Sequence, residues 1–247
     1  MSRVLPGLFV TGTDTGVGKT RVASAVARTL VAEGRRVGVL KPVATGASFI
    51  DGVWHCDDAE QLMKGAGRLV AINRVTPILF EEAVAPSIAA RRQGEPLTSE
   101  HLATEVARAI DWWAQEGEAE VMVVEGVGGL LCPLAEGTTI ADLAVQLDYP
   151  VLIVARLGLG TLNHTLLTVE AALRRSLRLA GVVLNSAAPP AGTLAEQTNP
   201  AELSRLLPDG VAILATIPYG DDSVLPDDWH HVDWFGRALV PRLSGSG

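Results

Sequence analysis

Basic residues, cysteines and long apolar runs are all scarce in this 247-residue sequence. Twenty Lys and Arg against 28 Asp and Glu give a net charge of −8, so the chain offers no basic surface for a nucleic-acid backbone. Two cysteines, Cys56 and Cys132, cannot form a disulfide framework, and the first residues do not resemble an export signal. Apolar runs such as 121–124 and 151–155 are far shorter than the roughly 18 residues that span a bilayer. We therefore expect a cytoplasmic protein with no nucleic-acid or membrane partner.

The composition is that of a folded α/β protein. Hydrophobic residues make up 48% and charged residues 19%, which disfavours a disordered chain or a coiled coil. Short β-rich runs alternate with longer helical periods, as expected of a mostly parallel sheet with helices on both faces. The predicted strands are residues 7–11, 36–40, 120–125, 150–155, 180–185 and 211–217. The predicted helices are residues 20–32, 99–115, 140–147, 162–175 and 201–207.

Residues 43–96 carry mixed apolar runs, several Pro and Gly, and no single period. We expect a long loop there, followed by short helices. The sequence has no internal repeat and no Pro/Ser/Gly-rich linker. These features favour a single α/β domain over residues 1–243, with a flexible tail at 244–247.

A glycine-rich segment follows the first predicted strand and opens the first predicted helix, and it reads Gly12-Thr13-Asp14-Thr15-Gly16-Val17-Gly18-Lys19-Thr20. Small residues let successive backbone N–H groups turn toward one anion, and the helix adds its positive N-terminal end. Lys19 would reach the β- and γ-phosphates, and the Thr20 hydroxyl would coordinate Mg²⁺. The usual G-x-x-x-x-G-K-[ST] pattern begins at position 13, where this chain has Thr13. An ordinary turn is the alternative, but the context favours a P-loop NTPase-like domain that binds a nucleoside triphosphate.

Two related nucleotide-binding classes are disfavoured by what stands at single positions. GTPases of this type read guanine with an Asn-Lys-x-Asp string, and the strand end at Asn185 has the Asn without the Lys or the Asp. Partitioning ATPases carry a second lysine five residues before the phosphate-loop lysine, and that place is Asp14. A regulatory P-loop ATPase with nucleotide-dependent partner binding stays open as the alternative function.

Three further segments place charged residues where open α/β sheets bind ligands, at the carboxyl ends of strands. Lys41 follows the second predicted strand and could aim at phosphates, and an ordinary exposed lysine at a strand end is an equal alternative on position alone. Asp57 and Asp58 could cap a helix start beside its dipole. Glu125 ends an apolar strand, where a charge is costly without a partner, and a phosphate-bound Mg²⁺ would supply one.

Taken together, these motifs resemble the dethiobiotin synthetase family, the ATP-dependent carboxylases of biotin biosynthesis. The resemblance runs nearly from end to end and is specific, because several independent strings agree in order and spacing. They are the phosphate loop from Gly12 to Thr20, Lys41-Pro42-Val43-Ala44-Thr45-Gly46, Val124-Glu125-Gly126-Val127-Gly128-Gly129, and Leu159-Gly160-Thr161-Leu162-Asn163-His164.

The resemblance implies a homodimer that converts 7,8-diaminopelargonate, CO₂ and MgATP into dethiobiotin, ADP and phosphate. It implies Lys41 and Lys19 as catalytic lysines. Thr20, Asp58 and Glu125 fall on the magnesium positions, and Asp58 is preferred to Asp57 because it directly precedes an alanine. The implied nucleotide-contacting residues are Thr13, Asp14, Thr15, Gly16, Val17, Gly18, Lys19, Thr20, Asp58, Glu125, Gly126, Val127, Gly128, Asn185 and Ser186, with Pro218, Tyr219 and Gly220 flanking the base.

On the substrate side, the resemblance implies contacts from Thr15 and from Thr45, where a serine is familiar. It also implies that the helix start Gly160-Thr161-Leu162-Asn163 is supplied by the partner subunit and takes the substrate carboxylate on free N–H groups. Plain capping of that helix by Thr161 or Asn163 is the alternative. Gly16 stands where a well-known member has a glutamate, so a nucleotide contact from that side chain is absent. Residues 221–228 match the family poorly.

Cobyrinate amidation enzymes are a further alternative within the same superfamily. They normally add a glutaminase domain with a catalytic Cys, and 247 residues leave no room for one.

Overall fold

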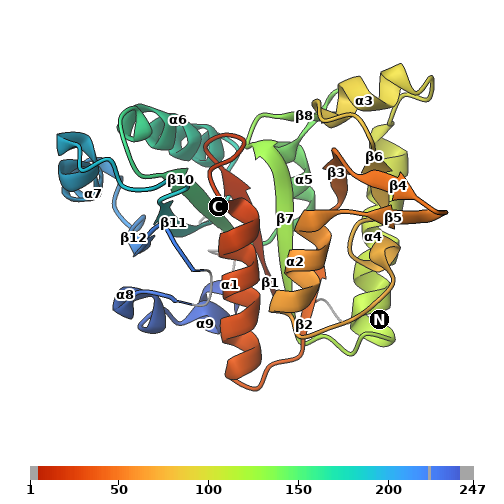
Figure 1. Cartoon of the computed structure of the whole chain (residues 1–247), viewed down its shortest axis with the longest axis horizontal. Helices are drawn as coiled ribbons and strands as arrows, with labels where there is room; N and C mark the ends of the chain where they lie inside the picture. Colours follow the sequence, from red (N-terminus) through yellow and green to blue (C-terminus); the bar gives the residue numbers. More distant parts are fainter. Residues whose placement is uncertain (1–4, 222–223, 240–247) are drawn as a thin grey trace, which may run out of the picture.

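Parallel strands form the central sheet of the computed structural model, which describes residues 5–221 and 224–239. Within those residues the sheet has six strands in the order β12-β11-β10-β1-β7-β2 (Figure 1). The strands are β1 (Gly7–Gly12), β2 (Val37–Leu40), β7 (Val121–Gly129), β10 (Val151–Arg156), β11 (Leu179–Asn185) and β12 (Ile213–Ile217). All five pairings are parallel. The α/β class and the existence of the six predicted strands are therefore confirmed, but β7 continues to Gly129, so Glu125 lies within the strand rather than at its end. The predicted tail at 244–247 lies outside the described residues.

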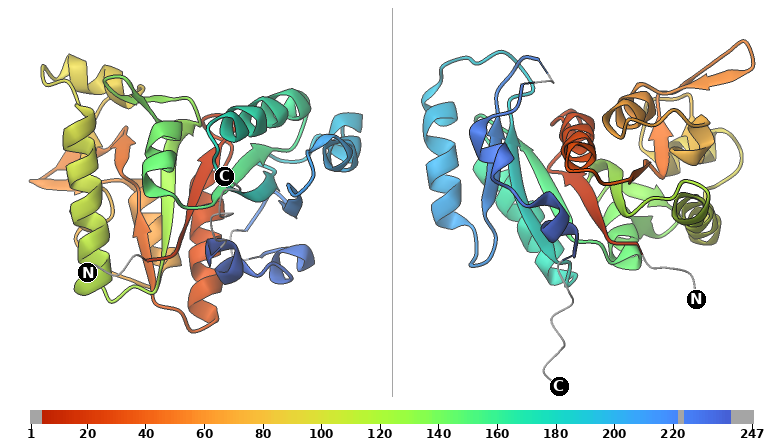
Figure 2. Two further views of the ribbon diagram at one scale, coloured as in Figure 1. Left: turned by 180° about the vertical axis from the view of Figure 1, so that it is seen from behind. Right: turned by 90° about the horizontal axis from the view of Figure 1, so that it is seen from below.

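Helices cover both faces of this sheet. One face carries α1 (Lys19–Ala32) and α2 (Asp57–Gly65), and the other carries α4 (Ser99–Gln115), α5 (Ile140–Leu147) and α6 (Thr161–Arg174) (Figure 2). The helices predicted at 20–32, 99–115, 140–147 and 162–175 correspond to α1, α4, α5 and α6, and their ends agree within one residue. Shorter helices are α3 (Pro86–Arg92), α8 (Asp227–His230), α9 (Trp234–Leu239) and the 3₁₀ turn η1 (Ile72–Arg74).

The predicted helix at 201–207 is wrong at its start, because α7 spans Leu194–Leu206. A capping box begins it: the Thr193 hydroxyl accepts from the backbone N–H of Glu196, and the Glu196 carboxylate accepts from the Thr193 N–H. This S/T-x-x-E signature is the local signal that would have placed the helix start at Leu194. Pro200 lies inside the helix.

The expectation for residues 43–96 needs correction. The segment contains four short strands in addition to helices: β3 (Val43–Thr45) pairs in parallel with β6 (Ile78–Phe80), and β4 (Ser48–Ile50) forms a hairpin with β5 (Val53–His55). Strands of three residues are too short to show a period of two, which is why the pattern did not reveal them. A further small pair joins β8 (Pro133–Ala135) to β9 (Thr138–Thr139).

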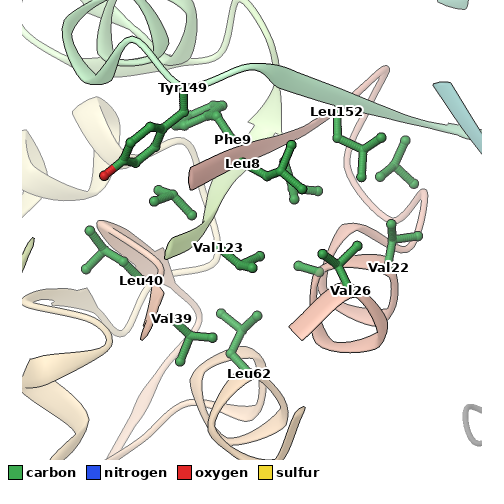
Figure 3. Close-up of a cluster of buried hydrophobic side chains, with 14 of the residues drawn as sticks. Leu8, Phe9, Val22, Val26, Val39, Leu40, Leu62, Val123, Tyr149 and Leu152 are labelled. Carbon is green, nitrogen blue, oxygen red and sulfur yellow. The ribbon is translucent and has the colours of Figure 1, made fainter. Parts of the chain in front are cut away.

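The hydrophobic core between α1, α2 and the sheet fixes the positions of the functional elements (Figure 3). Val22 and Val26 of α1 and Leu62 of α2 pack with Leu8 and Val123 of the central strands, and all five are fully buried. This packing aligns the carboxyl ends of β1, β2 and β7 with the amino-terminal turns of α1 and α2. None of the helices in the described ranges is long and apolar enough to cross a bilayer.

Candidate active site

A cleft of about 480 Å³ opens where the carboxyl ends of β1, β2 and β7 meet the first turns of α1 and α2. This is the edge of the sheet at which open α/β folds bind ligands. The residues that line it come from segments far apart in the sequence. They are Thr15, Gly16, Gly18, Lys19, Thr20, Arg21, Lys41, Thr45, Asp58, Glu125, Val127, Gly128, Asn185, Ser186, Ala187, Tyr219 and Gly220.

The phosphate loop leaves backbone donors available at the start of α1. Its N-cap is Gly18, at a φ of 93°, and no side chain caps the helix. A helix N-terminus without a capping side chain has unsatisfied N–H groups and a positive dipole end, which together favour an anion. The Lys19 ammonium lies beside this loop and donates to the Asp14 carbonyl at 3.0 Å. Burial lowers the pKa of Lys19, so an anionic ligand would compensate an ammonium that has lost much of its water.

Four side chains, from α1, α2, β7 and the residue after β2, converge next to that lysine. The Thr20 hydroxyl lies 2.8 Å from Asp58 Oδ1 and 2.9 Å from Glu125 Oε1. The Lys41 ammonium lies 2.8 Å from Glu125 Oε1 and also pairs with Asp58. Lys41 is 3% exposed and Glu125 is 1% exposed, so this ion pair is withdrawn from water. The structure therefore brings together Lys41 and the three residues predicted to hold magnesium.

The charges in this cluster influence one another. Burial lowers the pKa of Lys41, but the carboxylates of Glu125 and Asp58 outweigh that effect and raise it above its ordinary value. Burial also raises the pKa of Glu125, and the adjacent Lys41 ammonium opposes that rise. Burial of Asp58 is outweighed by Lys41, so its pKa is lowered. Among these three groups, burial therefore prevails over the neighbouring opposite charge only at Glu125, and a further positive charge nearby would favour its ionised form.

The donor set fits a hard divalent cation such as Mg²⁺. Glu125 Oε2 is buried and, among the residues described, has no hydrogen-bond partner, which leaves a carboxylate oxygen available for coordination. Thr20 and Asp58 add two oxygens on the same side of the cleft, and Mg²⁺ is usually held by one or two carboxylates together with phosphates and water. Across 5–221 and 224–239 no three His, Cys, Asp or Glu side chains form a cluster that could hold a metal ion. Magnesium would therefore depend on the Thr20 hydroxyl and on ligand oxygens.

Asp57 and Asp58 are neighbours in the sequence but face different surroundings in the structure. Both lie in the first turn of α2, whose N-cap Cys56 makes no side-chain cap. Asp57 is exposed to solvent, whereas Asp58 turns toward Thr20 and Lys41. Of the two, only Asp58 lines the cleft, and its role in holding magnesium stays a prediction.

The far end of the cleft is closed by the segments predicted to hold the base. Asn185 ends β11 and is 1% exposed. Its amide nitrogen donates to the Val17 carbonyl at 2.9 Å, and its amide oxygen accepts from Arg21 at 3.0 Å. Tyr219 and Gly220, which follow β12, line the same end.

The remaining predicted nucleotide contacts divide into two groups. Gly128 and Val127 line the cleft at the end of β7. Gly126 does not: it faces the core, where an added Cβ would lie 3.0 Å from Ile140. Thr13, Asp14, Val17 and Pro218 are not lining residues either. Three of these four supply backbone groups that shape the site, because the carbonyls of Asp14, Val17 and Pro218 accept from Lys19, Asn185 and Arg21, respectively.

Thr15 and Thr45, predicted to contact substrate, both line the cleft. The segment 160–163 does not belong to it. Gly160 is the N-cap of α6 at a φ of 91°, and no side chain caps the helix. Thr161 is instead buried against the Thr165 hydroxyl, so the alternative that Thr161 or Asn163 caps this helix is wrong.

Sequence reasoning missed Arg21 and Ala187 as lining residues. Arg21 donates to Asn185 and to the carbonyls of Pro218 and Gly220. Those partners are 164 or more positions away along the chain, so no local pattern signals the contact. The position of Arg21 in the first turn after the phosphate loop was the only sequence feature that suggested a place near the cleft.

Comparisons with known proteins bear on the fold and the family of this chain. A family model described as an AAA domain matches residues 6–226. Among solved structures, a ParA family ATPase from Chlorobium tepidum TLS superposes with a TM-score of 0.52 at 14% identity, covering 90% of this chain and 87% of that one. This likeness concerns the fold alone, and it confirms the predicted P-loop NTPase-like architecture.

Curated relatives define the family more closely. A protein of Anaeromyxobacter sp. (strain K) named ATP-dependent dethiobiotin synthetase BioD is 45% identical over 203 residues, which are 81% of this chain and 85% of the relative. A protein of Bacillus licheniformis with the same name is 37% identical over 229 residues, 92% of each chain. Identity and coverage of this extent show that the chain belongs to the ATP-dependent dethiobiotin synthetase family.

Proposed function

We propose that this protein carboxylates 7,8-diaminopelargonate with CO₂ and closes the ring to dethiobiotin, using ATP and Mg²⁺ and releasing ADP and phosphate. The observation that carries the proposal is the convergence, in one cleft of a dethiobiotin synthetase family member, of two buried lysines with Thr20, Asp58 and Glu125. The cleft joins an anion-binding helix start to an oxygen-rich cation site. This combination suits phosphoryl transfer from a triphosphate.

The reaction needs no nucleophile from the protein. One substrate amine adds to CO₂ and gives a carbamate. A carbamate oxygen attacks the γ-phosphorus of ATP, the bond to ADP breaks, and a carbamic-phosphoric anhydride forms. The neighbouring amine then attacks the carbonyl carbon, loses its proton as the cyclic urea closes, and expels phosphate that carries the former carbamate oxygen. The protein has to provide positioning and positive charge where oxygens accumulate negative charge.

Lys19 and Lys41, which both line the cleft, supply that charge. Lys19 stands beside the uncapped start of α1, the place for the β- and γ-phosphates. Lys41 follows β2 and reaches the cluster at Asp58 and Glu125, next to the expected terminal phosphoryl group. Thr20, Asp58 and Glu125 would hold Mg²⁺, which when bound neutralises charge on the phosphate oxygens.

We also propose that the active protein is a homodimer whose α6 helix start binds the substrate carboxylate in the partner's site. The N–H groups after Gly160 have no capping side chain, and they do not line the cleft of their own chain. Exposed leucines lie on and before this helix, including Leu159 and Leu167. Together with Leu131, Leu167 lines a groove that also includes Thr13 of the phosphate loop, so a partner docked on this face would come close to the site.

The proposed dimer has its own test. A diaminopelargonate analogue without the carboxylate should bind far more weakly than the substrate, and an analogue of equal affinity would remove this role from α6. Sedimentation should show a dimer, and a monomer that is fully active would contradict the shared site.

The activity is tested by mixing purified protein with 7,8-diaminopelargonate, bicarbonate, ATP and Mg²⁺ and following dethiobiotin by mass spectrometry. The proposal requires ADP and dethiobiotin to form in equal amounts, and only when all components are present. ATP hydrolysis that ignores diaminopelargonate but is stimulated by another protein, DNA or lipid would instead favour the alternative, a regulatory ATPase.

A further inference from the structure

We propose that Arg21 is a positioning residue for the nucleotide base, acting through Asn185 and the segment Pro218 to Gly220. The inference rests on the proposed function, because it presumes that ATP binds in the cleft. Arg21 lies in the first turn of α1, directly after Thr20, and it is partly buried.

The guanidinium joins the two segments that close the base end of the cleft. Its Nη1 lies 3.0 Å from Asn185 Oδ1 and 2.9 Å from the Pro218 carbonyl oxygen, and its Nη2 lies 3.4 Å from the Gly220 carbonyl oxygen. Asn185 ends β11, and the other two acceptors follow β12. One side chain on the phosphate-loop helix thus holds the ends of two neighbouring strands in place. Arg is suited to this role because its planar fork presents several donors in a fixed geometry.

This arrangement settles which way the Asn185 amide points. The Arg21 guanidinium has only donors, so it must face the amide oxygen, and the Val17 carbonyl must face the amide nitrogen. Flipping the amide would put two donors together at Arg21 and two acceptors together at Val17. Both internal contacts therefore favour the same orientation.

An amide held in this orientation retains one N–H and one oxygen lone pair for a ligand. That pairing complements adenine, which presents the N7 acceptor beside the N6 amino donor, and it conflicts with guanine, which presents two acceptors, N7 and O6. Asn185 lines the cleft, so the orientation that Arg21 supports is one that selects ATP over GTP. The bonds from Arg21 to the carbonyls of Pro218 and Gly220 flank Tyr219, which also lines the cleft.

The test compares Arg21→Met, which keeps the length of the side chain but removes its donors, with Arg21→Lys, which keeps the charge but not the fork. The affinity of each protein for ATP and for GTP is measured by calorimetry with Mg²⁺. The matched control is Arg205→Met on α7, an exposed arginine paired with Glu202 far from the cleft. Thermal unfolding of every variant shows whether the fold is intact.

We expect Arg21→Met to bind ATP about tenfold more weakly, the loss of roughly one charge-assisted hydrogen bond, while GTP affinity changes much less. The KM for ATP should rise by the same factor, with the KM for diaminopelargonate and kcat at saturating ATP unchanged. Arg21→Lys should lose part of the ATP affinity, and Arg205→Met none.

Three results would overturn the inference: wild-type protein that binds ATP and GTP equally, Arg21→Met that keeps wild-type ATP affinity, or Arg21→Lys that restores full affinity and so shows that charge alone matters. Failure of the proposed function gives a different signature. Wild-type protein would then form no dethiobiotin, while the ratio of ATP to GTP affinity would still decide the role of Arg21.

Discussion

Lys41 forms a buried ion pair in addition to its proposed catalytic role, and Lys41→Gln should affect both stability and turnover. The Lys41 ammonium is 2.8 Å from Glu125, and neither residue is more than 3% exposed. Removing one partner of a buried ion pair costs about 3 to 5 kcal/mol of unfolding free energy, because the other charge stays buried without compensation. We expect about 3 kcal/mol, at the low end of that range, because the Thr20 hydroxyl donates to the same Glu125 oxygen. For a chain of this size the midpoint would fall by about 6 to 12 °C.

Thermal unfolding of the ligand-free protein measures this loss. Lys64→Gln is the matched control, since Lys64 lies on α2 and is exposed; its midpoint should not change. Adding the substitution Glu125→Gln to Lys41→Gln should recover most of the stability, because two neutral amides no longer leave a buried charge unpaired. If Lys41→Gln unfolded at the wild-type temperature, or if the second substitution did not restore stability, the reasoning would be refuted.

The deficit should also depend on pH. Burial raises the pKa of Glu125, and loss of Lys41 removes the charge that opposes this rise. A group whose pKa is higher in the folded state stabilises the fold when protonated, so that stability is lost as the pH rises through the folded-state pKa. The gap between Lys41→Gln and wild type should therefore widen with rising pH and narrow on acidification, as measured by unfolding at several pH values. With ligands present, the same variant should turn over about 10²- to 10³-fold more slowly.

Two further predictions concern the fold around the cleft. Gly18→Ala should weaken ATP binding much more than Gly16→Ala. Both glycines have a positive φ, but only a Cβ at position 18 would meet a side chain, 2.1 Å from Asn185 Nδ2. Equal losses of affinity in a nucleotide titration would contradict this. Trp229→Ala should lower the free energy of unfolding by about 3 to 5 kcal/mol, since Trp229 is fully buried, donates to the Thr29 hydroxyl on α1 and packs on Trp234. A denaturation midpoint unchanged from wild type would show that α8 and α9 are not part of the core.

The sequence predicted the elements whose apolar pattern extends over enough residues to be recognised. The six strands of the sheet are largely apolar segments, so their existence could be predicted, and with it the place of Lys41 after β2 and of Glu125 in β7. The three-residue strands β3 and β6 could not be predicted, because their pairing depends on contacts between residues 43–45 and 78–80 rather than on local pattern. The start of α7 was missed although a signal existed in the capping box at Thr193.

The candidate site shows the same division between local and distant information. The phosphate loop and Lys41 each follow a strand and Glu125 lies within β7, so each could be found separately from the sequence. That Thr20 and Lys41 both meet Asp58 depends on the packing of α1 against α2, where the Ser24 hydroxyl donates to the Gln61 carbonyl at 2.9 Å. The partners of Arg21 lie 164 or more positions away along the chain, so only the folded chain reveals these contacts.

The central claim, that Lys19 and Lys41 act together on one terminal phosphoryl group, is tested most directly by a crystal structure with Mg²⁺ and a non-hydrolysable ATP analogue. The account predicts that the γ-phosphate lies within hydrogen-bond distance of both ammonium groups, with the metal on Thr20, Asp58 and Glu125. A triphosphate that contacts Lys19 but lies away from Lys41, or that binds outside this cleft, would contradict it.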